Sequence, residues 1–322
     1  MMSNSKVLWC DANTLAKDIS GKVYIVTGAN SGVGLATTRQ LVKQGGHVVM
    51  ACRRPEAAKE AMTSFAGLKG SAEVITCDLA DLQSVRNFVH QFKNQHSQLD
   101  GLMCNAGLVM MDNTPQYTAD GFEMTWACSF FGHFLLTELL LDTLKASAPS
   151  RIGLLSSVMH AGSAKNRYKI HLNDLDYRQR DFNNFDAYGE VKLAVVLYAK
   201  ELAERLEGTG VTTASIHPGW ARSNFGGNGL LMKVVRVVML PFQSMITNSN
   251  EESAQTSLHC LLSEDAPKHS GAYFSQHSVL YRDKQCRAGG WPMASPNPHA
   301  NNVQMAKQLV RTARERVDLP QA

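Results

Sequence analysis

The stretch KVYIVTGANSGVG, residues 22–34, decides the fold. A run of β-branched and aromatic residues, typical of a buried strand, leads through a glycine-rich turn into a helical pattern. Gly28, Gly32 and Gly34 let the backbone turn sharply and approach a pyrophosphate, although their spacing is GxxxGxG and not GxGxxG. The helix N-terminus offers free N–H groups to the phosphate charge. This stretch therefore predicts a dinucleotide site.

The same alternation of short apolar runs and amphipathic helices continues along the chain. Nearly continuous apolar strands separated by such helices indicate a parallel sheet covered on both faces. We expect a doubly wound α/β fold of the Rossmann type, built as a single domain with right-handed crossovers. The expected strands are 22–27, 47–52, 72–76, 101–104, 151–156, 212–217 and 271–274, and the clearest helices are 33–44, 82–95, 121–146 and 185–206.

The composition argues against several classes of protein. Of the 322 residues, 44% are hydrophobic and 19% are charged, which is typical of a globular protein with a sizeable core. A net charge of +4 without a Lys/Arg-rich run gives no reason to expect a nucleic-acid partner. Seven scattered cysteines without a CxxC pair argue against disulfides and zinc, and indicate a reducing compartment. The 11 histidines show no HExxH or other ligand spacing, so we expect no metal.

The N-terminal residues 1–20 contain no sustained apolar segment, so we expect an extension without a signal peptide, followed by one domain at 21–322. No run reaches the roughly 18 apolar residues of a membrane span. The longest comparable apolar run, residues 229–242, is interrupted by Lys233 and Arg236. These features predict a cytoplasmic protein without a transmembrane span, and peripheral contact with a membrane is the less favoured alternative.

The end of the second strand bears on the choice of cofactor. An NAD site typically has a carboxylate about 20 residues past the glycines, where it binds the ribose 2′-hydroxyl. Here the segment reads ACRRPE, with Arg53 and Arg54 and no acid before Glu56. Two guanidinium groups suit a 2′-phosphate, so we expect NADPH. A pair of solvated loop arginines is the alternative interpretation.

Polar residues also follow the third and fourth expected strands. Asp78 is placed to meet an adenine edge, and Asn105 and Gly107 to lie against a ribose. Each alone is compatible with ordinary turn chemistry. Together they agree with the rule that ligands bind at the carboxyl ends of strands in open α/β sheets.

A second group of residues suggests carbonyl chemistry. Ser156 and Ser157 follow the fifth strand, and Tyr188 and Lys192 lie four residues apart on one face of the next helix. Reduction of a carbonyl by hydride needs a proton donor, and Tyr serves only if its pKa falls from about 10. A nearby Lys ammonium favours the phenolate, and a serine hydroxyl can bind the substrate oxygen. Without the serine, the Tyr/Lys pair would be interpreted as two solvated surface residues without a catalytic role.

These motifs resemble the short-chain dehydrogenase/reductase family over about residues 20–320. The segments ACRR, IHLNDLDY and KLAVVLYAKELAERL are similar to its retinol dehydrogenase-like branch, which is related to WW-domain oxidoreductase and light-dependent protochlorophyllide reductase. The family motifs occur here in the family's order as TGANSGVG, CDLADL, CNAG, LLSSV, YGEVK and HPGWARS.

The resemblance implies roles at matching positions. Tyr188 becomes the proton donor, Lys192 its pKa-lowering partner and ribose ligand, and Ser157, not Ser156, the catalytic serine. Ser129 stands where the family has an Asn that holds a helix kink and a proton-relaying water, so we expect slower proton delivery. The implied cofactor contacts are Gly28, Asn30, Ser31, Gly32, Val33, Gly34, Arg53, Asp78, Leu79, Asn105, Ala106, Gly107, Tyr188, Lys192, Pro218, Gly219 and Ser223.

The expected function is that of an NADPH-dependent carbonyl reductase, an oxidoreductase for a hydrophobic aldehyde or ketone, retinal-like or lipid-derived, and its alcohol. Residues 224–250 are the expected substrate lid, although their apolar face also fits a helix packed on its own core. A protochlorophyllide-reductase-like enzyme is one alternative, against which the short step from Ser157 to Tyr188 argues. A catalytically weak NADP(H)-binding regulatory protein is another, favoured by Ser129. Homo-oligomer formation stays open.

Overall fold

The computed structural model describes residues 6–110, 112–163, 165–221 and 247–321. Most of the expected lid at 224–250 lies outside these residues, and so does Ser223. Part of the expected N-terminal extension packs on the domain. The side chain of Gln276 accepts a hydrogen bond from the Leu8 N–H at 2.7 Å and donates one to the Leu8 carbonyl at 2.8 Å.

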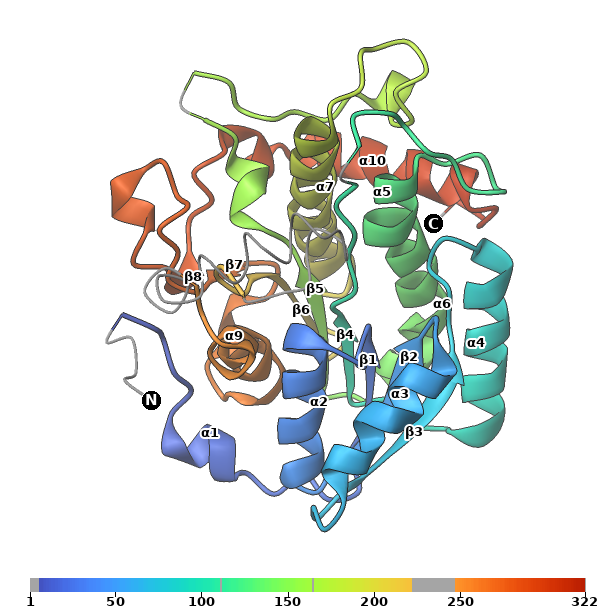
Figure 1. Cartoon of the computed structure of the whole chain (residues 1–322), viewed down its shortest axis with the longest axis vertical. Helices are drawn as coiled ribbons and strands as arrows, with labels where there is room; N and C mark the ends of the chain where they lie inside the picture. The colour runs from blue at the N-terminus through green and yellow to red at the C-terminus, as the bar shows by residue number, and fades with distance from the viewer. Residues whose placement is uncertain (1–5, 111, 164, 222–246, 322) are drawn as a thin grey trace, which may run out of the picture.

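The architecture is an eight-stranded sheet with the order β3-β2-β1-β4-β5-β6-β7-β8 (Figure 1). Neighbouring strands run parallel from β3 through β7, and the β7–β8 pair is antiparallel. The predicted doubly wound parallel sheet is confirmed. The strands are β1 (Val23–Thr27), β2 (His47–Cys52), β3 (Ser71–Thr76), β4 (Gly101–Cys104), β5 (Ser150–Leu155), β6 (Val211–His217), β7 (Tyr273–Ser275) and β8 (Gly290–Met293).

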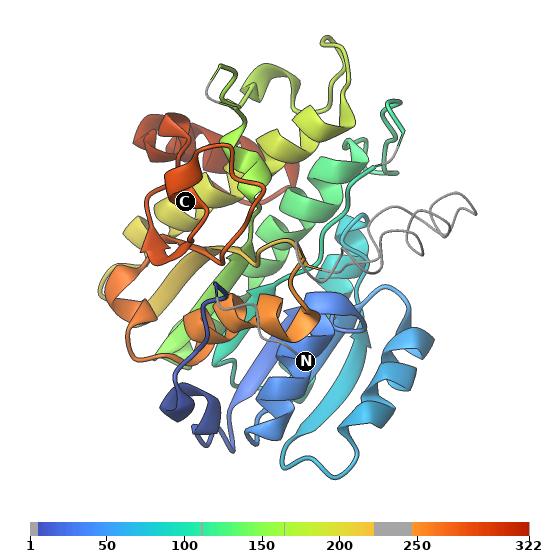
Figure 2. The ribbon, with the colours of Figure 1, turned by 60° about the vertical axis from the view of Figure 1, so that its left-hand side comes forward.

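Helices cover both faces of this sheet, as Figure 2 shows. One apolar core lies between the sheet and α4, α6, α7 and α10, and a second lies under α2, α3 and α9. All seven cysteines are free thiols, as the scattered spacing predicts. The α-helices are α1 (Ala12–Ala16), α2 (Gly32–Lys43), α3 (Pro55–Met62), α4 (Leu82–Gln95), α5 (Met124–Trp126), α6 (Gly132–Ala146), α7 (Asn184–Arg205), α9 (Asn250–Leu262) and α10 (Val303–Arg316).

Two of the differences from the sequence expectation have a clear physical reason. The helix expected at 121–146 begins at Met124, because the Glu123 carboxylate caps it by accepting the N–H groups of Thr125 and Trp126. Strand β8 is not predicted by the sequence pattern, since its four residues include Pro292 and show no alternation. Proline is tolerated there because β8 forms the edge of the sheet.

The segment Met124–Ala146 is long and apolar enough to cross a membrane, by length and composition only. However, 78% of the apolar 18-residue stretch within this segment is buried inside the protein. Its apolar character is explained by packing, since α6 contributes to the core beside α4. It therefore carries little weight as a membrane span.

Candidate active site

The glycine turn between β1 and α2 has the geometry that its residues predict. Gly28 and Gly32 have φ angles of +63° and +56°, a region that favours glycine. A Cβ on Gly34 would lie 2.4 Å from the Gly28 carbonyl oxygen, so α2 can approach the strand this closely only with glycine there. Ser31 precedes the helix without a side-chain cap, which leaves its first N–H groups available to an anion.

Thr27 ties this turn to the end of β4, where the strand order reverses. Its hydroxyl accepts the N–H groups of Asn105 and Ala106, each at 2.9 Å, and lies 2.8 Å from His133 Nε2. The Asn105 amide donates to the Thr27 carbonyl at 2.9 Å. Ligands bind at such a switch point in open α/β sheets. Thr27 is not among the site residues predicted from the sequence, and its position directly before the glycines is the signal that marks it.

The other predicted cofactor contacts lie at neighbouring strand ends. Arg53 and Arg54 follow β2 and are exposed, and neither guanidinium has a hydrogen bond or ion pair within the described ranges. Asp78 follows β3, where its carboxylate accepts the Ala80 N–H at 3.0 Å. Leu79 is buried against α6, and a Cβ on Gly132 would lie 2.3 Å from the Leu79 carbonyl oxygen. The structure thus gives Leu79 a packing role.

The expected catalytic residues meet at the end of β5. Lys192 is only 1% exposed, its ammonium donates to the Leu155 carbonyl at 2.8 Å, and its Nζ lies 5.4 Å from the centre of the Tyr188 ring. The Ser156 hydroxyl donates to the Lys192 carbonyl oxygen at 2.8 Å, which fastens α7 to the strand end. The Ser156 hydroxyl therefore has a structural partner, whereas the Ser157 side chain is the one that lowers the pKa of Tyr188.

The electrostatics differ from the expectation in one respect. Burial raises the pKa of Tyr188 to about 12, and the Ser157 side chain opposes this effect. Burial also lowers the pKa of Lys192 to about 8. In this structure the Lys192 ammonium is directed toward the Leu155 carbonyl, so the expected lowering of the Tyr188 pKa by Lys192 stays a prediction.

Two buried histidines hold the Ser157 segment. His160 Nδ1 lies 2.5 Å from the Ser157 carbonyl oxygen, and His217 Nδ1 accepts the Val158 N–H at 3.2 Å. Burial lowers the pKa of His160 to about 4 and that of His217 to about 3, so both are neutral near pH 7. The Ser157 hydroxyl also accepts the Met159 N–H at 3.2 Å. The sequence gives no sign that His217, at the end of β6, supports the catalytic loop.

Ser129 lies in the π-helical segment η2 (Ala127–Phe131), which joins α5 to α6. The helix distortion that the family resemblance implies is therefore present with serine at this position. The Ser129 hydroxyl accepts the Leu108 N–H at 3.3 Å. A Cβ on Gly107 would lie 3.4 Å from Lys192 Nζ and 3.8 Å from Ser129 Oγ, so Gly107 lies between the two.

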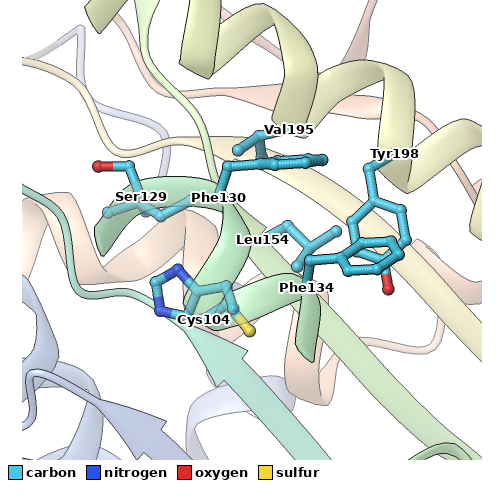
Figure 3. A pocket seen from close by; sticks show the side chains of 9 residues that line it. Cys104, Ser129, Phe130, Phe134, Leu154, Val195 and Tyr198 are labelled. Atoms are coloured by element: carbon cyan, nitrogen blue, oxygen red, sulfur yellow. The ribbon is translucent and has the colours of Figure 1, made fainter. Parts of the chain in front are cut away.

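Beside η2 lies a cavity of about 10 Å³, which is the space of about one water. In Figure 3 the Ser129 hydroxyl points away from the Phe130 and Tyr198 side chains. The cavity is mostly apolar, and the serine oxygen is directed to the Leu108 backbone instead. Its lining residues are Cys104, Ser129, Phe130, His133, Phe134, Leu154, Leu155, Val195 and Tyr198.

The loop after β6 contains the remaining predicted contacts. Gly219 has a φ of +83°, and a Cβ there would lie 2.2 Å from Asn248 Nδ2. The loop at Pro218 and Gly219 therefore packs closely against Asn248. The Asn248 N–H donates to the Trp220 carbonyl at 2.8 Å.

Comparisons with known proteins agree with this geometry. The family described as short chain dehydrogenase matches residues 22–167. The chain is 38% identical to retinol dehydrogenase 13 of Mus musculus, covering 90% of this chain and 82% of that protein. It is 37% identical to retinol dehydrogenase 11 of Homo sapiens, covering 88% and 86% respectively.

Solved structures share the fold. An uncharacterised protein from Mycobacterium paratuberculosis has a TM-score of 0.73 and 27% identity, covering 94% of this chain and 96% of that one. Pseudomonas aeruginosa RhlG, solved with NADP, has a TM-score of 0.64 and 20% identity, covering 82% and 97%. At that identity, the second likeness shows the fold alone.

Proposed function

Because this chain belongs to the short-chain dehydrogenase family and is a retinol dehydrogenase-like oxidoreductase, we propose that it interconverts a hydrophobic aldehyde or ketone and its alcohol, with NADP(H) as its cofactor. The observation that carries the proposal is the convergence of Ser157, Tyr188 and Lys192 at the end of β5. Lys192 Nζ lies there next to Gly107, which follows β4. We expect a retinal-like or lipid-derived substrate because the relatives are retinol dehydrogenases.

The residues at the strand ends fit a dinucleotide. A Cβ on Gly32 would meet nothing within 4 Å, so the turn is open on that side, and the start of α2 has free N–H groups for a phosphate. The buried Asn105 Oδ1 has no hydrogen-bond partner among the described residues and is therefore a free acceptor at the end of β4. Arg53, exposed and unpaired in the described ranges, supports a 2′-phosphate and hence NADP(H).

The nicotinamide cofactor, when bound, supplies or accepts the hydride. In the reductive direction the Tyr188 hydroxyl donates its proton to the carbonyl oxygen, and the Ser157 hydroxyl holds that oxygen by a hydrogen bond. The pKa of Tyr188 has to fall from about 12 for this transfer. Ser157 already lowers it, and the Lys192 ammonium, with its pKa of about 8, is positive at pH 7 and lies close enough to stabilise the phenolate.

The test is NADPH oxidation by the purified protein against a panel of hydrophobic aldehydes and ketones. We expect Tyr188→Phe to reduce turnover by about 100-fold or more, because it removes the general acid while keeping the ring. Tyr117→Phe is the matched control, since the Tyr117 hydroxyl donates to the Asp176 carbonyl and Tyr117 is not one of the expected catalytic residues. If Tyr188→Phe reduces the substrate as fast as the parent, the mechanism is wrong.

A catalytically weak NADP(H)-binding protein is the second candidate. The Ser129 hydroxyl, at the position to which the family resemblance assigns a proton relay, accepts the Leu108 N–H, and the small cavity beside it is lined mostly by apolar side chains. The same panel separates the two candidates. Tight NADPH binding without turnover of any compound would favour the binding protein.

A further inference from the structure

A cluster of three ligand-type side chains lies at the end of the sheet opposite the active site. His47 is the first residue of β2, Glu73 lies in β3, and His96 directly follows α4. His96 Nε2 is 2.5 Å and His47 Nε2 is 3.4 Å from the same carboxylate oxygen, Glu73 Oε1. The three potential ligand atoms all lie within 4.8 Å of one another.

Both imidazole rings are held in orientation by neighbours outside the cluster. His47 Nδ1 is hydrogen-bonded to the Ser71 hydroxyl at 2.7 Å, which leaves Nε2 to face Glu73. The Phe92 ring stacks on His96, with 5.0 Å between the ring centres. Such contacts to the second ring nitrogen or ring face orient histidine ligands in metal sites.

The side chains remain accessible to an ion from solvent. Their exposed fractions are 29% for His47, 35% for Glu73 and 17% for His96. Two imidazole nitrogens and one carboxylate oxygen form a ligand set that suits zinc, with water as the fourth ligand. Tetrahedral Zn²⁺ with ligands at about 2.0–2.1 Å places its ligand atoms about 3.4 Å apart, which matches the separation between His47 and Glu73.

We infer that His47, Glu73 and His96 form a divalent-metal site of the zinc type. Binding requires the His96–Glu73 hydrogen bond to open, so that the ion takes the place of the proton between them. The ion then fastens the edge strand β3 to β2 and to the end of α4, and stabilises the fold by mass action. Local spacing does not reveal this site, because its ligands come from three elements separated by 26 and 23 residues.

The test uses the full chain after treatment with a chelator, with Zn²⁺ alone as the probe. Calorimetry should give one ion per chain, and the thermal unfolding midpoint should rise by several degrees. Co²⁺ should bind at the same site and give visible absorption bands of a low-symmetry complex. We expect Glu73→Gln and His96→Gln each to weaken Zn²⁺ binding by about 100-fold or more, and Ser71→Ala by about 10-fold, because it frees the His47 ring.

His90→Gln is the matched control, because His90 lies on α4 but is exposed and outside the cluster. It should bind Zn²⁺ like the parent. Circular dichroism of each variant shows whether the fold is retained, and Ser71→Ala, a change on an exposed edge residue, keeps the test valid if a ligand variant fails to fold. Absence of Zn²⁺ binding to the parent, or equal binding by parent and ligand variants, would overturn the site and leave a His–Glu–His hydrogen-bond network.

Discussion

The nucleotide end and the catalytic end of the sheet are built in different ways. At the nucleotide end, the site is shaped mainly by backbone conformation. Gly28 and Gly32 adopt positive φ angles, and Gly34 allows α2 to approach the Gly28 carbonyl closely. At the catalytic end, side chains from the C-terminal part of the chain hold the Ser157 loop. His160 Nε2, for example, lies 2.7 Å from the Ser295 hydroxyl, 135 residues away.

This difference explains why the two ends are visible to different degrees in the sequence. A backbone-built site needs glycine at defined positions, and this requirement leaves a short motif. A site built from side chains depends on partners that are distant in sequence. The amide of Asn297 donates to the carbonyl oxygens of both His160 and Tyr168, at 2.8 and 2.9 Å, and no local pattern marks that asparagine as part of the site's support.

The largest expected effect separates the two adjacent serines. Ser157→Ala should lower kcat by about 100-fold, because the substrate oxygen and Tyr188 both lose the serine hydroxyl. Ser156→Ala should instead lower the free energy of unfolding by about 1 kcal/mol, because its hydroxyl bonds the Lys192 carbonyl. Steady-state kinetics and urea unfolding measure both. Equal loss of kcat in the two variants would contradict the division of roles.

The next effect tests the nucleotide end alone. Arg53→Ala should weaken NADPH binding by about 10-fold and leave NADH binding nearly unchanged, since only NADPH has the 2′-phosphate that the guanidinium would pair with. Fluorescence titration with each cofactor gives the two dissociation constants. Arg54→Ala, at the adjacent exposed position, shows whether the effect belongs to one arginine. Equal losses for NADPH and NADH would refute the phosphate assignment.

A smaller effect should appear when the remote support of the catalytic end is removed. Asn297→Ala leaves the His160 and Tyr168 carbonyl groups without a donor and should lower the free energy of unfolding by about 2 kcal/mol. We expect kcat to fall several-fold while the dissociation constant of NADPH stays unchanged, because the glycine turn does not depend on Asn297. Weaker NADPH binding together with unchanged kcat would show that the two ends are not separate in this way.

A final expected effect is a pH dependence of stability that belongs to the catalytic end. Burial lowers the pKa of Lys192 from 10.5 to about 8, so between these values the unfolded chain carries a proton that the folded chain has lost. The Lys192 contribution to the free energy of unfolding therefore rises with pH across this window, by at most about 1.4 kcal/mol per pH unit. Urea unfolding of the parent and of Lys192→Met at pH 7.5 and 10 isolates it. Parallel pH slopes in the two proteins would exclude a shifted pKa.

Much of the fold is predictable from the sequence. The expected bounds of β2, β4 and α4 agree with the structure to the residue, because each is a short, clear run of strand or helix periodicity. The pairing of Tyr188 with Lys192 also follows from sequence, since residues four apart share a helical face. Both inferences rest on local periodicity, which a single element reveals without its neighbours.

Tertiary structure alone decided the remaining features. Ser156 and Ser157 are chemically identical neighbours, and their roles diverge because the Ser156 hydroxyl meets the Lys192 carbonyl of a packed helix. The direction of the Tyr188 pKa depends on burial, which a sequence does not contain. The cluster of His47, Glu73 and His96 likewise exists only because two strands and a helix end meet at one edge. Local sequence determines backbone conformation, whereas the partners and burial of a side chain depend on long-range packing.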